Sequence, residues 1–158
     1  MSLRSFLARG HASLAARLVL GAVFLWLGAA KALDPAAFLK LVRQFDLLAS
    51  PLALNLVGAL LPWSEIVFGL LLLAGVLARG AALAAFLLLV AFTGAIAARA
   101  VALHGATGAA FCSLRFDCGC GTGEVYVCAK LAENSALAAL ALVVLLAPAH
   151  PFPFRAPR

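Results

Sequence analysis

The chain has 158 residues and a formal net charge of +6, and it is 66% hydrophobic but only 11% charged. Soluble domains average about 45–50% apolar and about 25% charged residues. This composition, with a mean hydropathy of +1.12, excludes a soluble enzyme, a disordered tail and a nucleic-acid-binding protein. We expect an integral membrane protein in contact with the lipid bilayer.

Four apolar stretches are bounded by charges and helix breakers, and each is close to the roughly 20 residues that a helix needs to cross a bilayer. They cover residues 13–33, 56–77, 81–98 and 129–147. Because open β edges cannot face lipid, the pattern predicts an all-α fold. We expect an integral membrane four-helix transmembrane bundle that forms a single domain over residues 1–158.

Two longer connections join these spans. Residues 35–48 place Phe38, Val42 and Phe45 at helical spacing opposite charged residues, which predicts a short helix in the membrane interface or at the foot of the second span. The other connection is a loop at residues 99–130. Glycines are expected to offer small surfaces for close helix contact, and they are Gly21, Gly28, Gly58, Gly69, Gly75 and Gly94.

The positions of the charges predict the orientation in the membrane. The N-terminal segment, the short turn at Arg79 and the C-terminal segment carry basic residues and no acid. All six acids fall on the other side, where the basic residues are spread over two longer loops. The positive-inside rule therefore predicts a multi-pass protein of the bacterial inner membrane, with both termini cytoplasmic and the loop at 99–130 in the periplasm.

The start of the chain also fits a secretory signal. It combines a basic beginning, an apolar stretch from Leu18 to Leu27, and Ala30-Lys31-Ala32 as a small-residue cleavage site. Cleavage there would leave three spans and place the two termini on opposite sides of the membrane.

Ionisable residues also occur at membrane depth. Lys31 and Glu65 each lie about 14 residues, or about 21 Å, from the arginine at the cytoplasmic end of their span. This depth is inside the outer leaflet of a hydrocarbon core about 30 Å thick. Because a charge inside the membrane usually pairs or lines a polar cavity, we predict that Lys31 and Glu65 approach each other. The alternative is that both snorkel to the interface.

Further polar and aromatic residues fall at the level of Glu65. Trp63 precedes it in the second span, and Asn134 lies near the start of the last span. With Lys31 and Glu65 they predict a pocket for a ring-shaped, lipid-soluble electron carrier, a quinone, beneath the cysteines. The alternative is ordinary packing and helix-cap chemistry. The sequence has no glycine-rich phosphate loop, so nucleotide-dependent chemistry is not expected.

All four cysteines, Cys112, Cys118, Cys120 and Cys128, cluster in the last loop. On an oxidising side of the membrane, an even number of clustered cysteines predicts disulfides. Four cysteines allow three pairings, which the sequence does not distinguish. If Cys118 pairs with Cys120, the ring contains only Gly119 between them, and glycine permits so tight a turn. Such a bridge should exchange easily.

Three interpretations of these cysteines remain open. Two inert disulfides would fasten the loop onto the bundle. In a redox relay, one pair would exchange with a client thiol and another would pass electrons toward the membrane. In a soft-metal site, Cys118 and Cys120 would bind Cu(I), whereas zinc sites usually have wider cysteine spacing.

Three segments resemble the MauE/DoxX family of small four-span membrane proteins: RLVLGAVFLWLGAAKALDPAAF, LPWSEIVFGLLLLAGVLARGAA, and DCGCG ahead of the last span. The resemblance covers about residues 15–147. Its motifs are a Gly-x2-Lys, Gly28 with Lys31, and a Pro-x2-Glu, Pro62 with Glu65. The Cys-Gly-Cys of the family is often followed by Phe-Gly, whereas Gly121-Thr122 follows here.

The resemblance implies a redox-associated role. MauE is implicated in maturation of the disulfide-rich small subunit of methylamine dehydrogenase, and the related DoxD belongs to a thiosulfate:quinone oxidoreductase. We therefore expect a membrane thiol–disulfide oxidoreductase that passes electrons between periplasmic thiols and a membrane quinone. Cys118 and Cys120 would exchange with a periplasmic thiol protein or a small thiol or sulfur substrate, and Cys112 and Cys128 would be a relay or a staple. The non-enzymatic alternative is a membrane assembly or Cu(I)-handling subunit with a disulfide-stapled loop.

Overall fold

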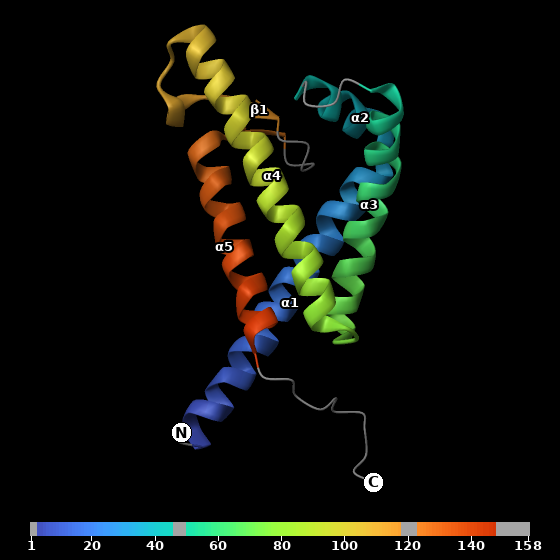
Figure 1. The fold of residues 1–158 in the computed structure, drawn as a ribbon, viewed down its shortest axis with the longest axis vertical. Coiled ribbons are helices and arrows are strands. Elements are labelled where there is room, and N and C mark those ends of the chain that lie inside the picture. Colours follow the sequence, from blue (N-terminus) through green and yellow to red (C-terminus); the bar gives the residue numbers. More distant parts are fainter. Residues whose placement is uncertain (1–2, 46–49, 118–122, 148–158) are drawn as a thin grey trace.

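The protein consists mainly of long helices. A computed structural model describes residues 3–45, 50–117 and 123–147 of the chain. Its helices, seen in Figure 1, are α1 (Leu3–Leu33), α2 (Pro35–Gln44), α3 (Pro51–Ala74), α4 (Ala78–Thr107) and α5 (Val127–Leu146). Between α4 and α5 lie a short 3-10 helix, η1 (Phe111–Ser113), and an antiparallel hairpin of β1 (Arg115–Asp117) and β2 (Glu124–Tyr126).

Four of these helices are long and apolar enough to cross a membrane: α1 from His11 onward, α3, α4 and α5. The predicted all-α membrane bundle is therefore confirmed. Helix α2 and the hairpin lie at one end of the bundle, and the first turns of α1 project beyond the other helices at the opposite end (Figure 1). We call the end formed by α2, η1 and the hairpin the cysteine end.

The spanning helices pack chiefly in two pairs, α1 with α3 and α4 with α5. Glycines bring the backbones of α1 and α3 together. A Cβ atom on Gly28 would lie 2.7 Å from the carbonyl oxygen of Pro62, and one on Gly69 would lie 2.7 Å from the backbone nitrogen of Leu25. The expected small contact surfaces are confirmed at these two positions, whereas Gly94 in α4 has nothing within 4 Å of its Cβ direction.

This difference predicts a matched pair of variants. Gly69→Val should destabilise the bundle by about 1–3 kcal/mol, because the new side chain meets backbone atoms that cannot move without separating α1 from α3. Gly94→Val should be nearly neutral, since that position is open. Thermal unfolding in detergent micelles, followed by circular dichroism, measures both. Equal losses of stability for the two variants would contradict the close α1–α3 contact.

The ends of two helices differ from the sequence-based boundaries. Helix α4 does not end at Ala98 but continues through Arg99 to Thr107, because a charge ends the apolar stretch without interrupting the helical backbone. It stops at Gly108, whose φ of +67° suits glycine. Helix α3 begins before residue 56, at Pro51, after Ser50 caps its first turn.

Helix α1 also begins earlier than expected, at Leu3 rather than residue 13. Its Leu20 is fully buried in the main core, and its Lys31 is buried as well. Residues that the secretory-signal interpretation would remove therefore form part of the bundle, and α1 is the main packing partner of α3.

The predicted short helix after the first span is confirmed as α2. The Asp34 carboxylate caps it by accepting a hydrogen bond from the backbone N–H of Ala37 at 2.9 Å. Phe38 is buried, whereas Lys40 and Arg43 are exposed, so the helix is amphipathic and packs against α3. It ends at Gln44, and residues 46–48 of the expected element lie outside the described part of the chain.

The hairpin was not expected from the sequence. Its strands pair Phe116 with Val125, and Asp117 with Glu124. Each strand has only three residues, which is too short for an alternating pattern to be recognised. In its described residues, 99–117 and 123–130, the predicted loop consists of a helical extension of α4, the 3-10 turn, the two strands and the first residues of α5.

Candidate functional site

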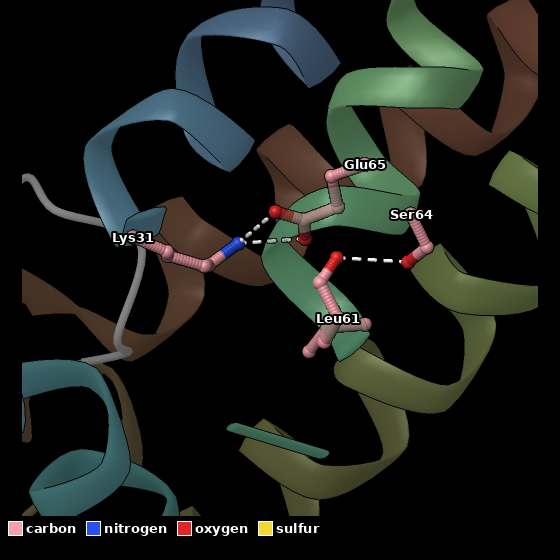
Figure 2. A network of polar contacts seen from close by, with 4 residues as sticks. All are labelled: Lys31, Leu61, Ser64 and Glu65. Atoms are coloured by element: carbon pink, nitrogen blue, oxygen red, sulfur yellow. Dashed lines mark hydrogen bonds and ion pairs between the residues drawn. The ribbon is translucent and has the colours of Figure 1, made fainter. Parts of the chain in front are cut away.

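An ion pair lies buried between α1 and α3. The Lys31 ammonium donates hydrogen bonds to both carboxylate oxygens of Glu65, each at 2.6 Å, as Figure 2 shows. Lys31 is 4% exposed and Glu65 is 3% exposed. The predicted approach of these residues is confirmed, and neither of them snorkels to the surface.

The local backbone explains this arrangement. Gly28 allows α1 to approach α3 at Pro62, and Lys31 and Glu65 each follow one turn later in their own helix. Proline cannot donate a backbone hydrogen bond within α3. Nearby, the Ser64 hydroxyl donates to the carbonyl oxygen of Leu61 at 2.8 Å (Figure 2).

Two aromatic rings face the Lys31 ammonium. Its Nζ lies 5.7 Å from the ring centroid of Phe38 in α2 and 5.4 Å from that of Phe92 in α4. Both distances are within the range at which a ring face attracts a cation. The ammonium is therefore stabilised by one carboxylate and two rings from three helices, which reduces the cost of keeping a charge at membrane depth.

The ion pair lines a small cavity to which all four spanning helices contribute. Its polar lining consists of Lys31, Glu65, Lys130 and Asn134. The apolar lining consists of Phe24, Leu27, Leu88, Leu89, Phe92 and Ile96. The cavity volume is about 20 Å³, which is enough for about one ordered water with polar partners.

The structure brings together three of the four residues expected to form a pocket. Lys31, Glu65 and Asn134 line the same cavity, and Asn134 is 5% exposed. Trp63 does not join them, because its side chain is 63% exposed on the outside of the bundle. Residues two positions apart on a helix point about 200° apart, so Trp63 and Glu65 cannot share one face.

Lys130 is a cavity residue that the sequence analysis missed. It is 2% exposed, and its ammonium donates to Glu133 at 2.9 Å, one turn along α5. A signal was present in the sequence, since Lys130 precedes Asn134 by four residues and Leu137 by seven. This spacing places all three on one helix face.

The described cysteines form a disulfide that fastens the loop. Cys112 in η1 is bonded to Cys128 in the first turn of α5, with their Cα atoms 5.0 Å apart. The bridge joins the two chain segments that flank the hairpin. Cys118 and Cys120 lie outside the described residues, in the segment between Asp117 and Gly123.

The hairpin covers the cavity at the cysteine end. Phe116 and Val125 belong to an apolar cluster with Leu27 and Ile96, and the latter two also line the cavity. Phe116 additionally makes an edge-to-face contact with Phe45 beyond α2, with ring centroids 5.9 Å apart. The chain segment that carries Cys118 and Cys120 is thus connected to strands that pack on two apolar residues of the cavity lining.

Within residues 3–45, 50–117 and 123–147, no group of three or more His, Cys, Asp or Glu side chains is arranged to hold a metal ion. The Cu(I) site considered for Cys118 and Cys120 falls outside these ranges.

Comparison with known protein families identifies a match over most of the chain. A family model described as methylamine utilisation protein MauE matches residues 9–147. The matched region contains the four spans, the Lys31–Glu65 pair and all four cysteines. None of the curated proteins and none of the solved structures matches the chain.

Proposed function

This chain belongs to the MauE family of membrane proteins, and from that premise we propose that it is a membrane thiol–disulfide oxidoreductase. It passes electrons from thiols outside the cytoplasm to a membrane quinone. The single observation that carries the proposal is the position of the hairpin, whose Phe116 and Val125 pack on residues that line the buried Lys31–Glu65 cavity. The segment that bears Cys118 and Cys120 joins those two strands.

The disulfide between Cys112 and Cys128 supports this assignment. A bridge between these residues indicates an oxidising environment and leaves Cys118 and Cys120 as the remaining pair. Their disulfide would enclose only Gly119, and so small a ring should be readily opened by a thiolate. We assign exchange to Cys118 and Cys120, and the fastening of the loop to Cys112 and Cys128.

The proposed reaction balances electrons and protons. A client dithiol reduces the Cys118–Cys120 disulfide by exchange and becomes a disulfide itself. The two cysteine thiols then return to the disulfide, losing two electrons and two protons, and the quinone takes up two electrons and two protons to become a quinol. The client is a thiol protein of the periplasm or a small thiol or sulfur compound.

Quinone enters this proposal as a mobile substrate. The donors of Lys31, Lys130 and Asn134 suit the carbonyl oxygens of a quinone ring, but a cavity of about 20 Å³ accepts a water and not a ring. Entry from the lipid would therefore require side chains such as Phe92 to move aside. The cavity residues fit the hydrogen-bonding chemistry of a quinone, but the cavity volume is too small for a permanently bound quinone.

The orientation belongs to the same proposal. The turn at Arg79, at the end opposite the cysteine end, carries a basic residue and no acid, and the positive-inside rule favours a cytoplasmic location for such short segments. Both termini would then be cytoplasmic in a bacterial inner membrane, with the hairpin in the periplasm.

Quinone reduction by the purified protein tests this function. With a dithiol donor and a soluble quinone analogue, we expect quinol to form faster than without protein. If the protein does not accelerate quinol formation and its two disulfides resist mild reductant, the result would favour an assembly subunit with a disulfide-stapled loop. No acceleration, together with free Cys118 and Cys120 thiols and bound copper, would favour Cu(I) handling. Thiol titration and metal analysis of the same sample separate these outcomes.

A further inference from the structure

A second ion pair connects the buried cavity to the surface. Lys130 lines the cavity and is 2% exposed, yet its ammonium donates to Glu133 at 2.9 Å. The Glu133 side chain is 52% exposed. One partner of this pair therefore faces the interior, and the other faces the surroundings of the bundle close to the cysteine end.

The cavity joins this second pair to the first. The Lys31–Glu65 pair and Lys130 line the same small space, with the Asn134 amide beside them. A water held there would have partners on several sides, since ammonium groups and an amide donate and a carboxylate accepts. Its volume of about 20 Å³ suffices for one water.

Two other sides of the cavity are apolar. Toward the cysteine end, Leu27 and Ile96 pack under Phe116 and Val125 of the hairpin. Toward the opposite end, the lining residues Phe24 and Leu89 belong to the main apolar core. Lys130 and Glu133 thus provide a charged connection between the cavity and the surface.

We propose that Glu133, Lys130 and a cavity water form a proton path from the extracytoplasmic surface to the Lys31–Glu65 pair. This inference rests on the proposed function, because oxidation of the dithiol releases two protons outside the hydrocarbon core and reduction of the quinone consumes two protons within it. In each transfer, Lys130 passes a proton to the water, Glu133 takes up a proton released at the surface, and Lys130 regains its proton from Glu133. The water passes a proton to the buried pair, and the pair passes it to an oxygen of a quinone that enters from the lipid when Phe92 moves aside.

The test compares quinone reduction by the full-length protein with dithiol donor and a soluble quinone analogue. Glu133→Gln and Lys130→Ala should each slow quinol formation at least about tenfold, as expected when a positioned proton-transfer group is removed. The solvent deuterium isotope effect on quinol formation should rise. Thiol–disulfide exchange between the donor and the Cys118–Cys120 disulfide should keep its rate, because this step needs no buried proton. Thiol labelling measures that rate.

The matched control is Glu124→Gln, which neutralises another exposed acid at the cysteine end, on β2, and should leave the rate unchanged. Added methylamine should restore activity to Lys130→Ala and not to Glu133→Gln, since the amine replaces only the missing ammonium. Wild-type rates in both path variants would overturn the proton path and leave the proposed function standing. An inactive wild type would overturn both. Glu133 is exposed, so its variant remains informative if Lys130→Ala does not fold.

Discussion

Glu65→Leu is expected to lower the free energy of unfolding of the bundle by about 3–5 kcal/mol, since removing one partner of a buried ion pair leaves the other charge uncompensated. The Lys31 ammonium donates to both Glu65 oxygens at 2.6 Å and is 4% exposed. After the substitution, the ammonium would keep its contacts with the rings of Phe38 and Phe92 but would lose its carboxylate partner. Unfolding in detergent micelles, followed by circular dichroism, measures the loss.

A double-mutant cycle with Lys31→Met completes this experiment. Each single variant should be strongly destabilised, whereas Lys31→Met with Glu65→Leu should recover most of the stability, because apolar residues of similar volume often replace a buried pair at little cost. Additive losses in the double variant would show that the two side chains act independently, contrary to the bidentate contact.

Cys118→Ser and Cys120→Ser are each expected to lower the rate of quinol formation to that of the uncatalysed reaction between dithiol and quinone. A serine hydroxyl cannot take part in thiol–disulfide exchange, so the loss should be complete in either variant. The folded bundle should keep its stability, because the fastening bridge joins Cys112 and Cys128 instead. Steady-state quinol formation and thermal unfolding, measured on the same preparations, check the two parts of this expectation.

The double variant Cys112→Ser with Cys128→Ser is the matched control. A bridge that closes a loop of about 15 residues contributes about 3 kcal/mol, so this variant should lose stability and still turn over at low temperature. If the folded double variant no longer forms quinol, the Cys112–Cys128 bridge would be identified as a redox relay. Activity retained in Cys118→Ser and Cys120→Ser would contradict their assignment as the exchanging pair.

The low charge content explains why the sequence predicted the bundle and its ion pair. In a chain with 11% charged residues, each ionisable residue within a span is conspicuous, and depth along the helix is fixed by the rise per residue. Lys31 and Glu65 could therefore be placed at one level before their contact was known. The contact itself depends on Gly28, which lets α1 approach α3 at Pro62.

Depth alone did not predict which side chains face inward. Trp63 lies at the correct level but points out of the bundle, whereas Lys130, at the end of the predicted loop, is buried in the first turn of α5. Both errors concern the direction in which a side chain points around the helix axis. That direction is indicated by the stripe of buried residues along the helix and not by the positions of its charges. The stripe on α5 contains Val127, Lys130, Asn134, Leu137, Ala141 and Val144.

The short elements around the cysteines were the least predictable part of the fold. Phe116 and Val125 face each other across three-residue strands, and their burial depends on Ile96 and Leu27 from two distant helices. No local pattern contains this information. The position of the hairpin above the cavity, on which the proposed function depends, therefore came from the structure.

A single-turnover reaction tests most directly whether electrons pass from the loop to quinone. The purified protein is reduced mildly enough to keep the bridge between Cys112 and Cys128, freed of donor, and mixed with excess quinone without oxygen. We predict one quinol formed per protein molecule, with the loss of two free thiols at Cys118 and Cys120 at the same rate. Thiols that persist while no quinol appears would contradict the account.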